Sequence, residues 1–515
     1  MKITALICNY MKHFIKSIKI LHPISFVVIL LALGSTMLRA ADYTWTSGTT
    51  ANWTTTTGWS PNAPVNGPTS SDNVVGTSGN NLQLNFTTHS INNFTVTTTA
   101  NSSWALQTGA TAPTTLNVAG TFTMDSAKSV FVMRNSGATT ATLTLTAANI
   151  SVVNTTGTFF LGNTSEATSL HAVSVSGATT VNAGAKLYMN VTNSANLGAL
   201  TANGQVALVT TTNNDISRTV TVASLAGSGI VNGNVSSGLN SSANLIINGS
   251  ASNTFSGVIA NGLNNSVVSL TKSGAGVQRL TGTNTYTGAT TVSSGTLLVD
   301  TGASVAASTS IVNGGLLKVN GISGGVTVNS GGSLGGSGRV GAVTLANGSF
   351  LKPGNSPGLL TAASSTWAAG STYQWEIDNA TGVAGTNWDL FSVTGALDMS
   401  ALSSSSKMNL VLESLSLDNY STTAPFSWVI AKAGSFTGIS AGPQDLTSLF
   451  NINSDAFNGG SVGNLPNGGF QVVTGTEGSL RTLNLVAIPE PSTHTLLLLA
   501  FTGLGVHVLS RHRRS

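Results

Sequence analysis

The sequence predicts an all-β solenoid, in which short strands stack coil upon coil along one axis. Composition is the first indication. The 515 residues include 58 glycines and only 7% charged residues, and Thr, Val, Ser, Asn and Ala fill most of the remainder. β-Branched side chains suit pleated strands, while Gly and Asn suit tight turns. Two further observations, alternating apolar runs and recurring turn glycines, favour the same fold.

Alternating runs occur repeatedly between about residues 74 and 250, each bounded by Gly, Asn or Ser. Examples are 114–118 (TTLNV), 141–145 (ATLTL) and 173–175 (VSV). An apolar residue at every second position is typical of a strand that is buried on one face. No sustained helical period interrupts these runs, so strands are expected throughout this part of the chain.

A repeating unit is clearest from 267 to 361, where an apolar-x-apolar stretch, an Asn/Ser-Gly turn and a second apolar stretch recur. The turn glycines Gly295, Gly315, Gly332 and Gly348 follow one another after 20, 17 and 16 residues. This spacing is the length of one coil of a β-helix. A single coil cannot bury its apolar face alone, so stacked coils are predicted to share one core.

The charge of the chain lies mostly at its two ends. The net charge is +4, but eight basic residues stand in the first forty or the last five positions: Lys2, Lys12, Lys16, Lys19, Arg39, Arg511, Arg513 and Arg514. The remaining 12 basic and 16 acidic residues give −4. A weakly acidic middle argues against nucleic-acid binding, which needs a basic surface.

Residues 1–40 have the build of a secretory signal peptide, with a basic segment, an apolar run over 24–33 and a small-residue zone. Cleavage is expected after Ala40 or, alternatively, Ala41. Translation from Met11 would give a leader of more usual length. The single cysteine, Cys8, lies in this leader, so neither a disulfide nor a thiolate metal site is expected in the exported chain.

The C-terminal segment 488–515 has three parts in order. Pro489, Glu490 and Pro491 are followed by the apolar run 496–509, and Arg511, Arg513 and Arg514 come next. A short transmembrane helix with positive charge on its cytoplasmic side is expected. This arrangement resembles the PEP-CTERM sorting signal of Gram-negative bacteria, which implies recognition by an exosortase, transient membrane anchoring and release to the surface or matrix.

The segment from Leu270 to Leu297 resembles the autotransporter-associated β-strand repeat. The matching stretches are LTKSGAG (270–276), NTYTGATTV (284–292) and GTL (295–297). This resemblance implies a right-handed parallel β-helix on the cell surface. The turn LKPGNSPG (351–358) is also typical of such passenger proteins, and the opening segment, with Trp45, Trp53 and Trp59, is like theirs too.

These three tryptophans allow two interpretations. Exposed rings could stack on sugars, or buried rings could cap the open end of the solenoid, and capping is the favoured one. A catalytic role is conceivable from the sequence for Glu376 and Asp378, which stand two apart on an expected strand and hence on one face, with Asp389 and Asp398 nearby. An exposed face of a weakly acidic strand is the simpler explanation.

Other chemistry has no support in the sequence. His89 and His171 are far apart, the Gly-rich stretch 331–338 lacks the residues of a phosphate loop, and no calcium-binding nonapeptide occurs. We therefore expect no catalytic residues, cofactor or metal. The expected organisation is a signal peptide (1–40), a solenoid with a Trp-rich cap (41–250), the repeat region (251–361), a C-terminal β unit (362–487) and the sorting signal (488–515).

The function expected from these features is that of a non-catalytic, exported surface or matrix protein. Signal peptidase and exosortase would be its partners during export, and exopolysaccharide or cell-surface components its partners afterwards. A polysaccharide-active β-helix enzyme, either lyase or hydrolase, is the alternative.

Overall fold

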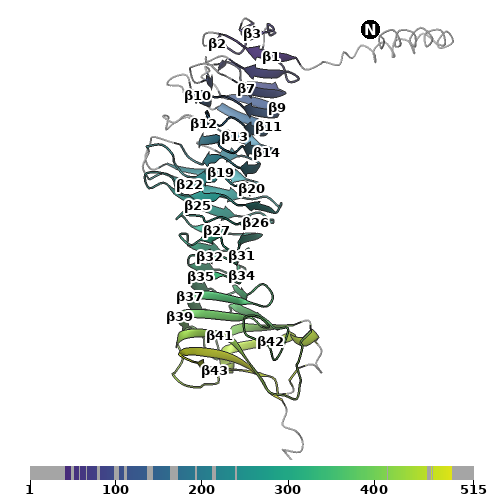
Figure 1. Ribbon diagram of the computed structural model, residues 1–515, viewed down its shortest axis with the longest axis vertical. Coiled ribbons are helices and arrows are strands. Elements are labelled where there is room, and N and C mark those ends of the chain that lie inside the picture. The colour runs from purple at the N-terminus through teal and green to yellow at the C-terminus, as the bar shows by residue number, and fades with distance from the viewer. Residues whose placement is uncertain are drawn as a thin grey trace, which may run out of the picture.

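The computed structural model describes most of the chain between Ala41 and Pro489. The described residues are 41–47, 51–56, 58–64, 67–77, 82–97, 104–108, 113–135, 143–162, 172–191, 194–210, 216–237, 240–414, 416–460, 465–466 and 468–489. They form a long column of stacked strands with the N-terminal strands at one end and the C-terminal strands at the other (Figure 1). Within them the structure contains two short 3₁₀ helices, η1 (Thr447–Leu449) and η2 (Phe457–Gly460), and otherwise strands and turns.

Each coil of the column contributes strands to three parallel ladders. Ladder 1 contains β6 (Thr88–Ile91), β9 (Thr114–Met124), β11 (Leu143–Val152), β13 (Ala172–Val175), β16 (Ser194–Asn196), β19 (Ser217–Val222), β22 (Ser242–Ile247), β25 (Val267–Lys272), β27 (Thr290–Val292), β30 (Ser310–Val312), β33 (Val326–Val328), β35 (Arg339–Leu345), β37 (Leu359–Trp367), β39 (Leu390–Asp398) and β41 (Phe426–Thr437).

Ladder 2 lies on the second face of the column. It contains β1 (Asp42–Trp45), β4 (Asn73–Gly76), β7 (Asn93–Val96), the second halves of β9 and β11, β14 (Ala178–Val181), β17 (Ala199–Ala202), β20 (Ser224–Ala226), β23 (Asn253–Phe255), β26 (Val277–Leu280), β28 (Thr296–Val299), β31 (Leu316–Val319), β34 (Ser333–Gly336), β36 (Phe350–Pro353), β38 (Thr372–Glu376), β40 (Met408–Glu413) and β42 (Phe450–Ala456).

Ladder 3 completes the cross-section. It contains β2 (Ala51–Asn52), β5 (Leu82–Leu84), β8 (Trp104–Thr108), β10 (Val130–Asn135), β12 (Thr158–Gly162), β15 (Lys186–Asn190), β18 (Gln205–Ala207), β21 (Ile230–Asn232), β24 (Val258–Ala260), β29 (Ser304–Val305), β32 (Ile322–Ser323) and the first halves of β35, β37 and β39. The three ladders confirm the predicted all-β, parallel solenoid. Its right-handed sense stays a prediction.

The core follows from the alternation of side chains along each strand. In β22, for example, Ala243, Leu245 and Ile247 are buried while the residues between them are partly exposed. The turn glycines stack as expected, because the amides of Leu316, Ser333 and Phe350 donate to the carbonyls of Gly295, Gly315 and Gly332. Stacked coils therefore share one apolar interior, as the repeat spacing predicted.

Coil length varies strongly along ladder 1. Paired residues of neighbouring coils are 25 residues apart for Leu245 and Leu270, and 20 apart for Leu270 and Thr290. The separation is 16 residues for Ser310 and Val326, and 32 for Ser365 and Leu397. The longer coils accommodate loops outside the ladders. The boundary expected between the repeat region and the C-terminal β unit, at 361/362, falls inside β37. Both halves of β37 pair with β39, so ladders 1 and 3 run across this position.

Two side chains complete the ladders where backbone pairing is interrupted. Between β20 and β23 only one bridge, Gly227 to Phe255, joins ladder 2. Here Gln278 reaches across two coils: its Oε1 accepts from the Leu225 amide (3.2 Å) and its Nε2 donates to the Leu225 carbonyl (2.9 Å). In ladder 3, Asn284 Oδ1 accepts from the Ile259 amide (2.9 Å) in the same way.

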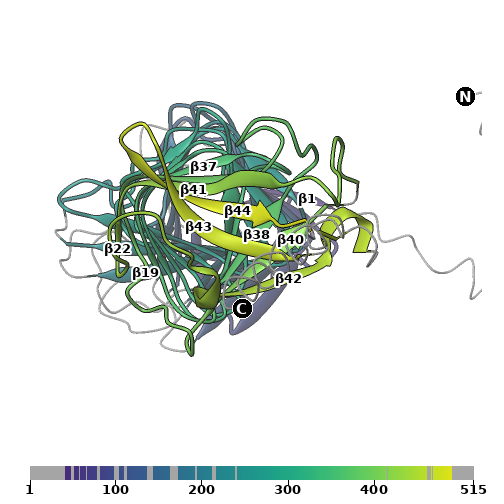
Figure 2. The ribbon, with the colours of Figure 1, turned by 90° about the horizontal axis from the view of Figure 1, so that it is seen from below.

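The two ends of the column are closed differently. At the N-terminal end β3 (Trp59–Ser60) runs antiparallel to β1. At the C-terminal end β44 (Leu480–Ala487) pairs antiparallel with β41, and β43 (Phe470–Glu477) pairs antiparallel with β44. These strands lie across the end of the column when it is viewed from below (Figure 2).

Within the described residues no helix is long and apolar enough to cross a membrane. The helix predicted over 496–509 lies outside the described residues, as do the whole leader 1–40 and all of the sorting signal after Pro489.

Replacing Gln278 with Leu is expected to lower the free energy of unfolding by about 2–3 kcal/mol, because the buried amide and carbonyl of Leu225 would lose their partner. Urea denaturation measures this change. Gln83→Leu, on the outer face of β5, is the matched control and should change stability little. An equal effect of the two substitutions would contradict the bridging role of Gln278.

Candidate functional site

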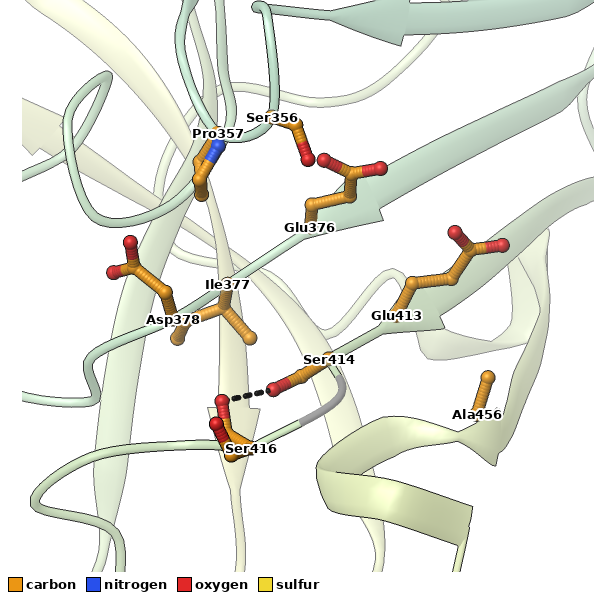
Figure 3. Close-up of a pocket in the computed structure, with 9 residues that line it drawn as sticks. All are labelled: Ser356, Pro357, Glu376, Ile377, Asp378, Glu413, Ser414, Ser416 and Ala456. Carbon is orange, nitrogen blue, oxygen red and sulfur yellow. Dashed lines mark hydrogen bonds between the residues drawn. The ribbon is translucent and has the colours of Figure 1, made fainter.

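A hollowed surface that contains several carboxylates lies on the outer face of ladder 2, in the C-terminal half of the column. We call it the ladder 2 groove. Its larger part has a volume of about 460 Å³ and its smaller part about 160 Å³, and the two share Ser356 and Glu376. The side chains that line the larger part are Ser356, Pro357, Glu376, Ile377, Asp378, Glu413, Ser414, Ser416 and Ala456 (Figure 3).

The register of ladder 2 places two glutamates side by side in this groove. Glu376 ends β38 and pairs with Glu413 at the end of β40, so their Cα atoms lie in neighbouring parallel strands about 4.8 Å apart. Both side chains extend to the same side in Figure 3. The side-chain Nε2 of Gln374 donates to Glu413 Oε2 at 2.5 Å. Two adjacent carboxylates can accept hydrogen bonds from hydroxyl groups of a ligand.

The pair considered from the sequence, Glu376 and Asp378, is not the pair that the structure brings together. The side chain of Asp378 points away from that of Glu376 (Figure 3), and its Oδ1 accepts from Asn387 Nδ2 at 3.1 Å. β38 ends at Glu376, so the alternation of a strand does not continue to Asp378. Asp398 lies on ladder 1, away from the groove, and caps the Ser400 amide.

Asp389 lies beneath the groove and is only 1% exposed. Its Oδ1 accepts from the Gly358 amide (2.8 Å) and its Oδ2 from the Glu376 amide (3.1 Å). It thus ties the turn 353–358 to the end of β38. The pKa of Asp389 is raised to about 8, mainly by burial and in smaller part by the charges of Glu376 and Glu413, against the lowering effect of these two hydrogen bonds.

The smaller part of the groove carries two lysines and an apolar side chain at one side, with Glu376 and the buried Asp389 also in its lining. Lys318 lies on β31 and Lys352 on β36. Both pair in register with Gly335, which lies on the strand between them. Leu316, from the same strand as Lys318, also lines this part. Sequence reasoning missed these lysines because no local motif marks them.

Ladder 1 presents a different surface, which is nearly uncharged. On its outer face, one residue of each strand pairs in register with one residue of the next strand. These residues carry hydroxyl, amide or aliphatic side chains, with a single acid. They are Ser90, Asn117, Thr146, Ser174, Asn196, Thr221, Ile246, Thr271, Thr291, Ile311, Thr327, Thr344, Thr366, Asp398 and Thr437. This hydroxyl row offers many weak hydrogen bonds at regular spacing.

The tryptophans at the N-terminal end are in the core. Trp45 and Trp53 are 0% exposed and Trp59 is 3% exposed. Trp59 packs edge-on against both, with ring centroids 4.8 and 5.3 Å apart. Burial excludes stacking of these rings on sugars, and the rings fill the first coil, as the capping interpretation predicted.

The sequence-predicted processing residues fall at the limits of the described chain. Ala41 and Pro489 are described, whereas Ala40, Glu490, Pro491, Arg511, Arg513 and Arg514 lie outside the described residues. His89 packs against Trp53, and His171 is outside the described residues. Within the described part of the chain, no group of three or more His, Cys, Asp or Glu is placed to hold a metal ion.

Comparison with known families gives one match. Residues 270–299 match the passenger-associated-transport-repeat, which confirms the repeat recognised from the sequence. No curated protein matches the chain. The matched segment runs from β25 to β28 and contains both Gln278 and Asn284, the residues that complete ladders 2 and 3.

The raised pKa of Asp389 predicts a pH dependence of stability. An unfolded aspartate releases its proton near pH 4, whereas folded Asp389 keeps it to about pH 8. Between these values the folded chain binds more protons, so its stability falls as pH rises, by up to about 1.4 kcal/mol per unit. Urea denaturation between pH 5 and 8 should show this decline relative to Asp389→Asn. Parallel pH profiles of the two proteins would show that Asp389 is ionised when folded.

Proposed function

We propose that this protein is a non-catalytic, exported β-solenoid of a Gram-negative cell surface or extracellular matrix, where it adheres to or scaffolds exopolysaccharide. The match to the passenger-associated-transport-repeat supports a surface location. The long parallel solenoid supports a structural role, because a column of this kind spans distance and presents the same contacts coil after coil.

The observation that carries the proposal is the regular register of the outer faces. The hydroxyl row on ladder 1 repeats one strand spacing apart, about 4.8 Å, over most of the column. Each hydroxyl can donate and accept one weak hydrogen bond with a sugar. Many such contacts on one polymer raise the overall affinity well above that of any single contact.

The position of the sorting motif agrees with processing at the C-terminal end. Among the described residues, Ile488 is the last whose backbone is hydrogen-bonded to the column: its amide donates to Gly469 and its carbonyl accepts from Gly468. Pro489, the first residue of the predicted Pro-Glu-Pro motif, follows directly. A motif so placed would be accessible to an exosortase while the apolar segment 496–509 holds the chain transiently in the membrane.

A polysaccharide-active enzyme is the second candidate, and the paired Glu376 and Glu413 in the groove favour it. Under the first proposal, purified protein binds the host's exopolysaccharide without shortening it. Shortening that is lost in the Glu376→Gln, Glu413→Gln double variant would establish the enzyme instead.

Intact mass and cell fractionation in the native host test the export proposal. The wild type is expected in the surface or medium fraction, with a mass that lacks both ends. Replacing Pro489, Glu490 and Pro491 with Ala should leave residues 496–515 attached and the chain in the membrane fraction. Pro425→Ala, in an exposed turn, is the control and should behave like the wild type. A wild-type mass that retains 496–515 would contradict sorting.

A further inference from the structure

We propose that the smaller part of the ladder 2 groove binds a carboxylated polysaccharide, such as a polyuronate, through Lys318 and Lys352. This inference rests on the proposed function and names the ligand class for it. The residues that carry it are Lys318, Lys352, Gly335, Leu316 and Phe350.

The register sets the spacing of the two lysines. Lys318 pairs with Gly335, and Gly335 pairs with Lys352 in the following coil, so the lysines stand two strand spacings apart, about 9.6 Å. Gly335 has no side chain, so the hollow between the lysines stays open. One strand spacing is close to the advance per sugar of an extended polysaccharide. A chain lying along the column would therefore present a carboxylate to each lysine from alternate sugars.

Neither lysine is neutralised within the fold. In the same ladder Arg279 forms an ion pair with Asp300, but Lys318 and Lys352 have no ion pair among the described residues. Two cations that flank one hollow attract an anionic ligand, and the attraction is strongest at low salt.

The apolar neighbours suit a sugar ring. Phe350 and Leu316 are half-buried on the outer face, and Lys352 lies over the Phe350 ring, 5.6 Å from its centroid. An aromatic face beside a cation can pack against the C–H face of a pyranose while the cation meets its carboxylate. Glu376 lines the same hollow as the lysines, and Glu413 lines the adjoining larger part of the groove. Both would accept from sugar hydroxyls, and a bound carboxylate would have to lie on the lysine side, away from them.

Binding of sodium polygalacturonate to the purified protein tests this proposal, with neutral dextran as the comparison. The wild type should bind polygalacturonate more tightly than dextran, and the binding of polygalacturonate alone should weaken as salt is raised. The Lys318→Gln, Lys352→Gln double variant should bind about tenfold more weakly. Both lysines point outward, so the variant should keep the wild-type unfolding midpoint.

Lys186→Gln, on the outer face of β15, is the matched control and should bind like the wild type. Equal binding by the double variant, or an equal loss in the control, would overturn the site. A wild type that binds host exopolysaccharide but not polygalacturonate would refute the lysine site and leave the proposed function standing. Failure to bind either polymer would refute both.

A different observation carries a second inference, at the N-terminal end. We infer that signal cleavage between Ala40 and Ala41 leaves the new α-ammonium group of Ala41 ion-paired with the carboxylate of Asp72. Hydrolysis of this peptide bond by the peptidase consumes one water; Ala40 keeps the new carboxylate and Ala41 the new amine, which is protonated at neutral pH. The inference rests on the proposed export.

Asp72 is already arranged to receive this cation. It is 6% exposed, and its Oδ1 accepts from the Ala41 backbone nitrogen at 3.1 Å. Its Oδ2 accepts from the amide and hydroxyl of Thr69, each at 2.7 Å, and no Lys or Arg pairs with it among the described residues. The Asn73 amide donates to the Ala41 carbonyl (2.8 Å), which fixes Ala41 beside the carboxylate.

The ionised state of Asp72 is favoured in the fold. Burial raises the pKa of Asp72, but the hydrogen bonds from Thr69 and Ala41 lower it more, so the net shift is downward. The other titratable groups on the neighbouring strands are Asp42, Tyr43 and His89.

Asp72→Asn tests this inference on processed protein from the native host. Thermal unfolding from pH 6 to 9 should show a higher midpoint for the wild type, and this difference should shrink as the α-amine loses its proton; Asp42, Tyr43 and His89 are common to both proteins and cancel. If protein that begins at Ala41 shows the same difference in midpoint at every pH, the ion pair is refuted while export stands. An intact mass that corresponds to a chain beginning at Met1 or Met11 would refute cleavage as well.

Discussion

The structure depends on one constraint, which is that every coil must satisfy its backbone hydrogen bonds through the coils above and below it. In a solenoid these bonds run along the column axis, so any gap in a ladder leaves buried polar groups without partners. Gln278 and Asn284 show how the chain meets this constraint where strands are missing, since their side-chain amides take the place of a peptide group. The family-matched segment 270–299 holds both residues, and it therefore contributes to the continuity of the column as well as to its length.

The same constraint explains the two ends, where one side of the last coil has no neighbour. At the N-terminal end three buried tryptophans fill the interior that would otherwise open to water. At the C-terminal end the β43–β44 hairpin turns antiparallel, and residues 444–447 hydrogen-bond to the outer edge of β43. An aromatic cluster that includes Trp428, Phe457 and Phe470 packs under this cap. Each end thus combines an antiparallel strand with buried aromatic side chains.

The candidate binding surfaces follow from the register of the coils. Parallel pairing places outward residues of successive coils in straight rows, so side chains that are distant in sequence become neighbours at a fixed spacing. Ladder 1 gains a nearly neutral hydroxyl row in this way, and ladder 2 gains a row with Lys318 and Lys352 and, two residues further along its strands, the paired Glu376 and Glu413. A protein that contacts a linear polymer can use such rows directly, because polymer and column both repeat along one axis.

The sequence by itself determined the strands, their inward faces, the coil repeat and the transport-repeat segment, because alternation and turn glycines are local properties that neighbouring residues set. It also suggested that the tryptophans cap an end. Only the tertiary structure decided which outward residues meet. Glu376 faces Glu413 rather than Asp378, and Lys318 stands in line with Lys352, because paired residues of neighbouring coils are separated by anything from 16 to 43 residues and no fixed count gives the register. The bridge from Gln278 to Leu225 was hidden for the same reason: its partner lies 53 residues away, two coils back.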